Sequence, residues 1–232
     1  MEHMRSEVGM SIKIWGRPTS ARTQKVLLAM AELGLPHELV LASGTMGAHG
    51  HVAKGNQAFG VVDTPEYRAM NPNGTVPTIL DNDFVLWESN AILQYLAMRY
   101  DPDRFYGSNT ERFASASRWI MWENNELIPP MHTLVKHTIR LPEEQREPLV
   151  AETARAALTR AWDIVEDQLS RTEHIADDSW SYGDIPMTIR VHRWALLAGE
   201  DALSPHLARY YGQVSTRPSF DAVRDPAMHL AG

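Results

Sequence analysis

Strand-like and helix-like patterns of apolar residues follow one another at the start of the chain. Residues 11–15 alternate polar and apolar side chains, which is typical of a half-buried strand. An apolar stripe with helical spacing then runs from Ser20, a favourable capping residue, to Gly34, a favourable C-terminal stop. Residues 37–41 predict a second strand. This order of strand, helix and strand favours a parallel pair with a right-handed crossover.

One long irregular segment and four further elements complete the first part of the chain. Residues 43–63 are rich in glycine and alanine without periodicity, which predicts a long loop. A Thr-Pro pair predicts a helix over residues 64–71. The remaining elements are strands over residues 75–80 and 84–86 and a helix over residues 90–99 that Ser89 caps. Together these elements make a β-α-β-α-β-β-α unit.

The rest of the chain has helical patterns only. We expect helices over residues 110–138 and 148–170, and again from residue 181 onward. Residues 181–184 (SYGD) resemble a helix-capping box, with an aspartate at the third helical position. We therefore predict an α/β domain over residues 11–100 followed by an all-helical domain over residues 108–232.

Composition and charge narrow the class of protein. The chain has 232 residues, of which 44% are hydrophobic and 22% charged, and no stretch approaches the apolar length of a membrane-spanning helix. The first ten residues lack the apolar core of a secretory signal, so we expect a flexible extension and a cytoplasmic protein without membrane contact. The net charge of −7 argues against nucleic acid as a general partner.

The absence of cysteine limits the chemistry further. It excludes disulfides and any mechanism that uses a thiol of the protein, so thiol chemistry would need a borrowed thiol. Within the acidic chain, residues 11–25 contain four basic side chains and no acidic one. This segment predicts a small positive neighbourhood that suits a small anion.

Ser20 is the first candidate for chemistry. As a structural residue it is only an N-cap. As a functional residue its hydroxyl could donate a hydrogen bond to a thiolate, because a helix N-terminus favours negative charge. Such a bond contributes about 1.5–3 kcal/mol, which lowers a thiol pKa from about 8.5 by about one to two units. Thr19 is adjacent and could serve instead, and Arg22 would favour the thiolate as well.

Two further features could bind a ligand main chain. An X-Pro bond is usually trans, but a cis bond at Val76-Pro77 would turn the main chain of Val76 toward an edge and offer an extended peptide a strand-like contact. The sequence leaves the isomer open. Glu88 and Ser89 are either an acid and a cap at a helix start, or a site for an α-amino acid. In the second interpretation Ser89 takes the carboxylate and Glu88 the ammonium.

The long loop contains three more candidates. His49 and His51 form a weak metal signal without an acid or cysteine at useful spacing, so we expect no metal site. Lys54 could reach a second carboxylate of an extended anionic peptide.

Four ordered segments carry a resemblance to a known family. They are residues 71–77 (NPNGTVP), 86–92 (LWESNAI), 181–184 (SYGD) and 217–220 (RPSF). Together they resemble the cytosolic glutathione S-transferase superfamily, over nearly the whole chain. The resemblance implies a thioredoxin-like glutathione-binding domain, an all-helical domain that shapes the site for the second substrate, and a homodimer.

The resemblance also implies roles for individual residues. Val76, beside Pro77, binds the cysteinyl backbone of glutathione, and Glu88 with Ser89 holds its γ-glutamyl end. By position, Ser20 matches the catalytic serine of the serine-type classes.

The assignment of the thiol-activating residue and of the class stays open. Thr19 could replace Ser20. Arg22 stands where relatives often carry cysteine, asparagine or another small polar residue, and it is a candidate partner of the thiolate or a carboxylate. The loop over residues 43–63 also resembles bacterial and fungal branches with glutathione-disulfide reductase activity.

In the family the helical domain supplies the pocket for the electrophile. The candidates here are Trp122, Asn125 and His132 on the first long helix. A row of such side chains along one helix is also typical of a hydrophobic core or of a dimer contact.

Three functions follow from these residues. We expect conjugation of glutathione, the co-substrate, to a small hydrophobic electrophile. The alternatives are a glutathione-dependent disulfide reductase without a protein cysteine, and a non-catalytic protein that binds glutathione or another ligand.

Overall fold

A mixed four-stranded sheet organises the first part of the chain. The computed structural model describes residues 12–43, 52–53, 57–58, 61–103 and 109–225. In order across the sheet, the strands are β2 (His37–Leu41), β1 (Ile12–Gly16), β5 (Thr78–Asp81) and β6 (Phe84–Trp87). β1 pairs in parallel with β2 and antiparallel with β5, and β5 pairs antiparallel with β6. The predicted parallel pair is confirmed.

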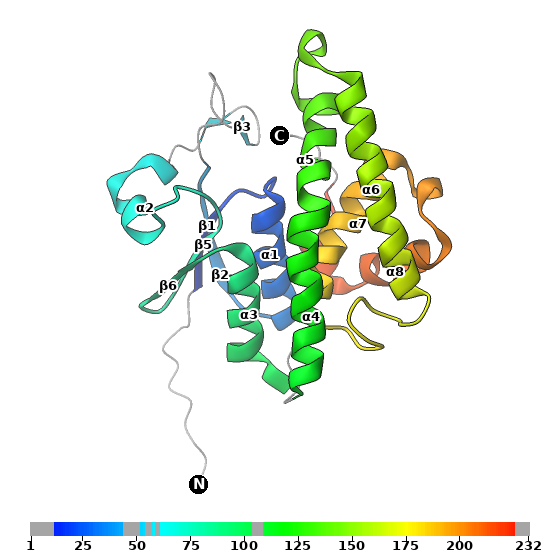
Figure 1. The fold of residues 1–232 in the computed structure, drawn as a ribbon. Coiled ribbons are helices and arrows are strands. Elements are labelled where there is room, and N and C mark those ends of the chain that lie inside the picture. Colours follow the sequence, from blue (N-terminus) through cyan, green and yellow to red (C-terminus); the bar gives the residue numbers. More distant parts are fainter. Residues whose placement is uncertain (1–11, 44–51, 54–56, 59–60, 104–108, 226–232) are drawn as a thin grey trace.

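Helices cover both faces of this sheet (Figure 1). α1 (Ala21–Leu33) and α3 (Ser89–Tyr100) lie on one face, and the short α2 (Pro65–Met70) lies on the other. The alternation in β1 explains this arrangement, since Ile12 and Ile14 are buried in the core with α1 while Trp15 packs in a separate cluster with Tyr67 of α2. α1 begins after the cap Ser20 and ends at Gly34 in a left-handed conformation, as predicted.

The segment between β2 and α2 is more ordered than the sequence predicts. Its described residues include an antiparallel pair of two-residue strands, β3 (Val52–Ala53) and β4 (Gln57–Ala58), and a 3-10 turn over Val61–Asp63. The expectation of a plain loop over residues 43–63 is therefore wrong at these positions.

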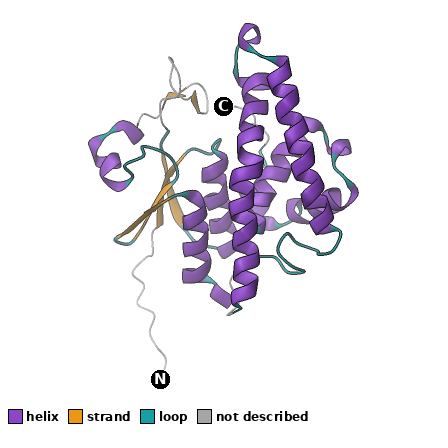
Figure 2. Ribbon diagram, viewed as in Figure 1, coloured by secondary structure: helices purple, strands orange, loops and turns teal. Residues whose placement is uncertain are grey.

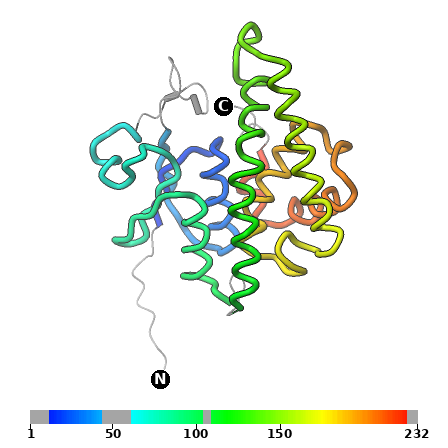
Figure 3. Tube along the Cα trace, viewed as in Figure 1, coloured from blue at the N-terminus to red at the C-terminus, as the bar shows by residue number. Residues whose placement is uncertain are grey.

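Among its described residues, the second part of the chain has helices and the loops that join them but no strand (Figure 2). α4 (Thr110–Trp122), a π-helical segment (Glu123–Leu127), α5 (Ile128–Val135) and a second π-helical segment (Lys136–Arg140) follow without interruption as one long helix. The other helices are α6 (Pro148–Leu169), α7 (Asp184–Ala198) and α8 (Pro205–Ser215), with 3-10 turns at Glu143–Gln145, Glu200–Ala202 and Pro218–Ala222. Figure 3 shows α6 running back beside the long helix. None of the described helices combines the length and apolarity that crossing a membrane requires.

The predicted capping box before α7 is wrong in its position, because Asp184 is the first residue of α7 and Gly183 is the cap. The hydrogen bond from Ser181 to Asp184 that such a box implies is present. The Asp184 carboxylate accepts hydrogen bonds from the backbone N–H of Ser181 at 2.8 Å and from that of Ile175 at 3.0 Å. The Ser181 hydroxyl accepts from the N–H of Gly183 at 3.3 Å. Asp184 thereby fixes both the start of α7 and the preceding loop.

A buried ionic cluster joins α1 to the helical part. Lys25 in α1 is fully buried, and its Nζ donates to Glu123 Oε2 at 2.7 Å. Arg190 in α7 donates to the other oxygen of the same carboxylate. Near the end of the described chain, Arg217 donates two hydrogen bonds of 2.7 Å to the Glu32 carboxylate in α1. These contacts fix the two parts of the chain relative to each other.

Candidate active site

A cavity of about 690 Å³ lies where the sheet part meets the helical part. Its lining residues come from the loop before α1 and the first turn of α1, residues 73–77, the junction of β6 and α3, the α5 region, and α7. Most residues predicted for the site line this cavity, namely Thr19, Ser20, Arg22, Val76, Pro77, Glu88, Ser89 and His132.

Ser20 is held at the N-terminus of α1. Its backbone is extended, and its Oγ accepts a hydrogen bond from the N–H of Thr23 at 3.4 Å. The hydroxyl oxygen thus serves as the cap, and no described residue accepts the hydroxyl hydrogen. Only 9% of Ser20 is exposed. Ser20 can therefore donate one hydrogen bond into the cavity while it still caps the helix.

Thr19, the alternative to Ser20, is more constrained. Its Oγ1 accepts a hydrogen bond from Arg17 at 3.1 Å, and its carbonyl accepts one from Arg193 at 3.1 Å. Arg193 also donates to the side chain of Gln24 at 3.0 Å. The loop before α1 is thereby tied to α7 across the cavity wall.

The Val76-Pro77 bond is cis, which settles the isomer that the sequence leaves open. The strand predicted over residues 75–80 begins later, at Thr78, because proline has no N–H for the ladder and the turn takes up the residues before it. Two side chains fix this turn, since the Tyr67 hydroxyl and the Asn71 amide both donate to the carbonyl of Thr75, at 2.7 and 2.9 Å. Tyr67 and Asn71 are supporting residues that the sequence analysis did not identify.

The junction of β6 and α3 presents Glu88 and Ser89 to the cavity. Ser89 is the first residue of α3 and is 2% exposed, so the prediction of Ser89 as the N-cap is wrong by one position. The cap position is Glu88, whose φ of 74° is unusual for a residue with a Cβ. No side chain caps this helix end, so the first N–H groups of α3 lack a side-chain partner among the described residues.

Arg22, the candidate partner of a thiolate or a carboxylate, forms an ion pair with Glu88. Its guanidinium lies 3.3 Å from a carboxylate oxygen of Glu88, and both side chains are about half exposed. A ligand ammonium at Glu88 would therefore meet a carboxylate that already has a cationic neighbour.

The helical wall of the cavity differs from the prediction. His132 lines the cavity together with Ile128, Met131 and Val135 of α5, but Trp122 and Asn125 do not. Trp122 packs edge-on against Trp119, in a smaller hollow that also includes Ile164 of α6, and Asn125 is exposed. The intervening π-helical segment widens one turn of the helix, so residues before and after it do not share one face.

Arginines are the feature of this cavity that the sequence analysis largely missed. Besides Arg22, the lining includes Arg17, Arg140, Arg190 and Arg193. Burial, and next the nearby Arg140, lower the pKa of Arg17 to about 10. Burial, followed by the charges of the three other arginines, lowers the pKa of Arg193 as well. Only Arg17 stood out in the sequence, as part of the basic segment near the N-terminus.

Two predictions concern residues outside the described part of the chain. Lys54 and the pair His49 and His51 lie there, so their positions relative to the cavity stay predictions. Among the described residues, no cluster of three or more potential metal-ligating side chains occurs.

Comparison with known proteins agrees with this geometry. Residues 19–99 match the family described as glutathione S-transferase, N-terminal domain. Glutathione S-transferase GstB of Escherichia coli (strain K12) is 30% identical over 210 residues, which cover 90% of this chain and 95% of that protein. Glutathione S-transferase 4 of Zea mays is 28% identical, and the alignment covers 92% of each chain.

A solved structure extends the similarity to three dimensions. The theta class glutathione S-transferase of Xanthomonas axonopodis pv. citri, crystallised with glutathione bound, is 30% identical. It superposes with a TM-score of 0.78 over 94% of this chain and 99% of that one. The chain therefore belongs to the glutathione S-transferase superfamily, with a thioredoxin-like sheet domain followed by a helical domain.

Proposed function

We propose that this protein is a glutathione transferase in which Ser20 activates the thiol of bound glutathione. The observation that carries the proposal is the position of the Ser20 hydroxyl, which caps α1 and opens on the same cavity as Val76 and the start of α3. The relatives named glutathione S-transferase support the activity.

Glutathione would lie along the sheet side of the cavity. No described residue forms a hydrogen bond with the main chain of Val76, so its N–H and carbonyl are available to the cysteinyl backbone of an extended peptide. The γ-glutamyl carboxylate would accept from Ser89 and the first N–H groups of α3, while Glu88 takes the ammonium. We propose Lys54 for the glycyl carboxylate.

Ser20 would act by stabilising the thiolate over the thiol. A hydrogen bond to a charged group contributes about 1.5–3 kcal/mol, which lowers the thiol pKa by about one to two units. The thiolate fraction at pH 7 then rises from about 3% to about half of the bound glutathione. The α1 N-terminus and the cationic lining act in the same direction.

The experiment compares Ser20→Ala with Thr19→Val. In Ser20→Ala we expect the pKa of bound glutathione to rise by about one to two units and kcat/KM at pH 6.5 to fall about tenfold to hundredfold. The KM for glutathione should change less than about threefold, because the peptide anchors lie elsewhere. Thr19→Val should leave the thiol pKa unchanged, because the proposal assigns the thiolate contact to the Ser20 hydroxyl at the α1 N-terminus.

The pKa follows from the pH dependence of thiolate absorbance in the binary complex. An unshifted pKa with full turnover in Ser20→Ala would remove Ser20 from its role, and the same result with a shift in Thr19→Val would assign the role to Thr19. Binding of glutathione without any thiol pKa shift in the parent protein would indicate a non-catalytic binding protein. A disulfide substrate assayed beside a halo-aromatic one separates conjugation from disulfide reduction.

We also propose the family's usual organisation for this chain. It comprises a two-fold homodimer in the cytoplasm, with domains over residues 11–100 and 108–232. Size-exclusion chromatography with light scattering tests the dimer.

A further inference from the structure

The charge of the cavity is far from balanced. Of the described residues that line it, five are arginines and only Glu88 carries a carboxylate. Arg22 pairs with Glu88, and Arg190 with Glu123 behind the wall. The protein as a whole has a net charge of −7, so this concentration of positive charge is local to the cavity. Part of this charge would favour the thiolate of bound glutathione, and the rest is available to a second anionic group in the same cavity.

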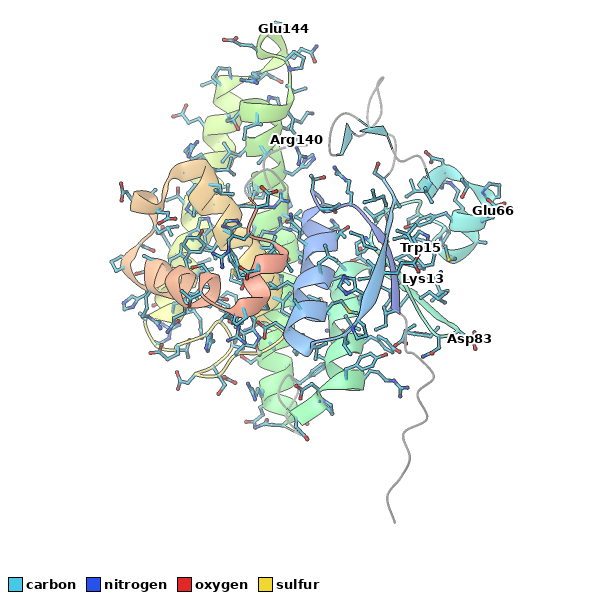
Figure 4. All side chains as sticks on the ribbon, turned by 180° about the vertical axis from the view of Figure 1, so that it is seen from behind. Lys13, Trp15, Glu66, Asp83, Arg140 and Glu144 are labelled. Carbon is cyan, nitrogen blue, oxygen red and sulfur yellow. The ribbon has the colours of Figure 1, made fainter. Side chains whose placement is uncertain are left out.

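Three of these arginines converge from distant segments. Arg17 follows β1, Arg193 belongs to α7, and Arg140 ends the second π-helical segment of the long helix. Figure 4 shows Arg140 toward one end of that helix, on the side of the sheet part. Arg17 and Arg193 are 8% and 4% exposed, so their charges are largely shielded from water. Arg17 and Arg193 both donate to Thr19, so these two like charges lie near each other in a poorly solvated site, which favours an anion beside them.

Arg140 is the member best placed to bind a ligand. Arg193 holds Thr19 and Gln24, and Arg17 holds the Thr19 hydroxyl, as described above. The side chain of Arg140, by contrast, forms no hydrogen bond to any described residue. Its Nε is buried without a hydrogen-bond partner, as are the Nε atoms of Arg17 and Arg193, which donate through their other nitrogens. Burial lowers the pKa of the Arg140 guanidinium, yet the group stays charged at neutral pH.

An apolar strip lies on the same helical wall. Ile128, Met131 and Val135 are spaced by three and four residues and line the cavity on the α5 side. His132 adds no fixed charge, since burial and then the charges of Arg140 and Lys136 lower its pKa. An apolar strip beside a free guanidinium fits a molecule with an apolar body and one anionic group.

We propose that the second substrate of this transferase is an amphipathic electrophile that carries a carboxylate or sulfonate, bound by Arg140 with support from Arg17. This proposal rests on the transferase function proposed above and defines the chemical class of its electrophile. Of glutathione's own carboxylates, the γ-glutamyl one is assigned above to the α3 N-terminus and the glycyl one to Lys54, so neither is assigned to Arg140. The cationic helical wall is thus left for the other reactant.

A halo-aromatic acid is a suitable probe of this class. With 4-chloro-3-nitrobenzoate, the thiolate sulfur would form a bond to the ring carbon that bears chlorine, and the carbon–chlorine bond would break to release chloride. The thiol proton leaves to solvent when the thiolate forms, so no oxidant or other reactant is needed. The methyl ester of the same acid is the neutral comparison.

The experiment measures kcat/KM for the acid and the ester in four proteins: the parent, Arg140→Gln, Arg140→Lys and Arg160→Gln. Arg160 is an exposed residue of α6 outside the cavity lining, and its substitution makes the same change in net charge. We expect Arg140→Gln to lower kcat/KM for the acid about tenfold or more and to change that for the ester less than about twofold. Arg140→Lys should recover part of the loss, and Arg160→Gln should match the parent.

The outcomes separate this proposal from the function it rests on. Equal losses for acid and ester in Arg140→Gln, or a loss explained by a raised KM for glutathione, would overturn the proposal while the transferase function stands. Unchanged use of the acid in Arg140→Gln would overturn it as well. If the parent conjugates neither compound nor any neutral halo-aromatic, the transferase function itself fails.

Discussion

Glu88 combines an unfavourable backbone conformation with a predicted ligand contact, and the two can be separated by substitution. Its φ of 74° and ψ of 108° lie where residues with a Cβ are rare. Such a conformation costs about 1–3 kcal/mol, whereas glycine adopts it without strain. Glycine in turn loses about 0.5–1 kcal/mol more on folding, through its greater freedom in the unfolded chain. We therefore expect glycine at this position to stabilise the fold by about 1 kcal/mol relative to a side chain of similar size.

The comparison that isolates this effect is Glu88→Gly against Glu88→Gln. Both lose the charge and the half-exposed ion pair with Arg22, which is worth at most about 1 kcal/mol, but only glycine relieves the backbone. Urea denaturation followed by tryptophan fluorescence should give Glu88→Gly the higher free energy of unfolding by about 1 kcal/mol, and a melting temperature about 2–4 °C higher.

Calorimetry should show that both variants bind glutathione more weakly than the parent. The reasoning fails if Glu88→Gln is as stable as Glu88→Gly, because the conformation of residue 88 would then carry no cost. It fails separately if Glu88→Gly binds glutathione as tightly as the parent, because the carboxylate would then have no part in binding.

Two further predictions concern the buried ionisable groups His192 and Glu123. Burial lowers the pKa of His192 to about 4, so below about pH 6.5 the unfolded chain takes up a proton that the folded protein does not. The free energy of unfolding should fall by up to about 3 kcal/mol between pH 6.5 and 4, and urea titrations at pH 7 and 4.5 should show a smaller fall in His192→Gln; equal falls would contradict this. Glu123→Gln leaves Lys25 and Arg190 buried without their carboxylate, and we expect a loss of about 3–5 kcal/mol at pH 7, against less than about 0.5 for the exposed neighbour Glu126→Gln. A loss below about 1 kcal/mol in Glu123→Gln would show that the cluster contributes little.

Local chemistry explains which parts of the fold the sequence predicts well. The strand over residues 37–41 and the helix between Ser20 and Gly34 depend on alternation, a cap and a C-terminal glycine, which act within a few residues. The predicted start of α3 is one residue too late, because serine is a better N-cap than glutamate and the pattern therefore favours Ser89 over Glu88 as the cap. Neighbouring structure fixes Glu88 in its unusual conformation, and no local pattern reveals that.

The residues of the helical domain that line the cavity do not follow from local sequence patterns, because their positions depend on helix register and on contacts between distant segments. The prediction of Trp122 and Asn125 assumes that the first long helix keeps one register, but a π-helical segment begins immediately after Trp122. The arginine cluster depends on contacts across the whole chain, as shown by Arg193 binding Thr19 over a separation of 174 residues. Arg140 stands in a polar stretch of sequence that resembles any exposed helix end. Its role follows only from the tertiary structure.

The arginines that line the cavity differ in whether they also hold the fold together. Arg190 and Arg193 line it but also hold Glu123 and Thr19, so their loss would disturb the attachment of α7 to α1 and the loop before Ser20. Arg140 has no such second task among the described residues, and it belongs to the helical part. Val76, Glu88 and Ser89, in contrast, line the cavity from the sheet part. Substitution at Arg140 can therefore alter the charge offered to the second substrate while the thiol site keeps its geometry. We therefore expect a substitution at Arg140 to change which electrophiles the protein uses without changing how it activates glutathione.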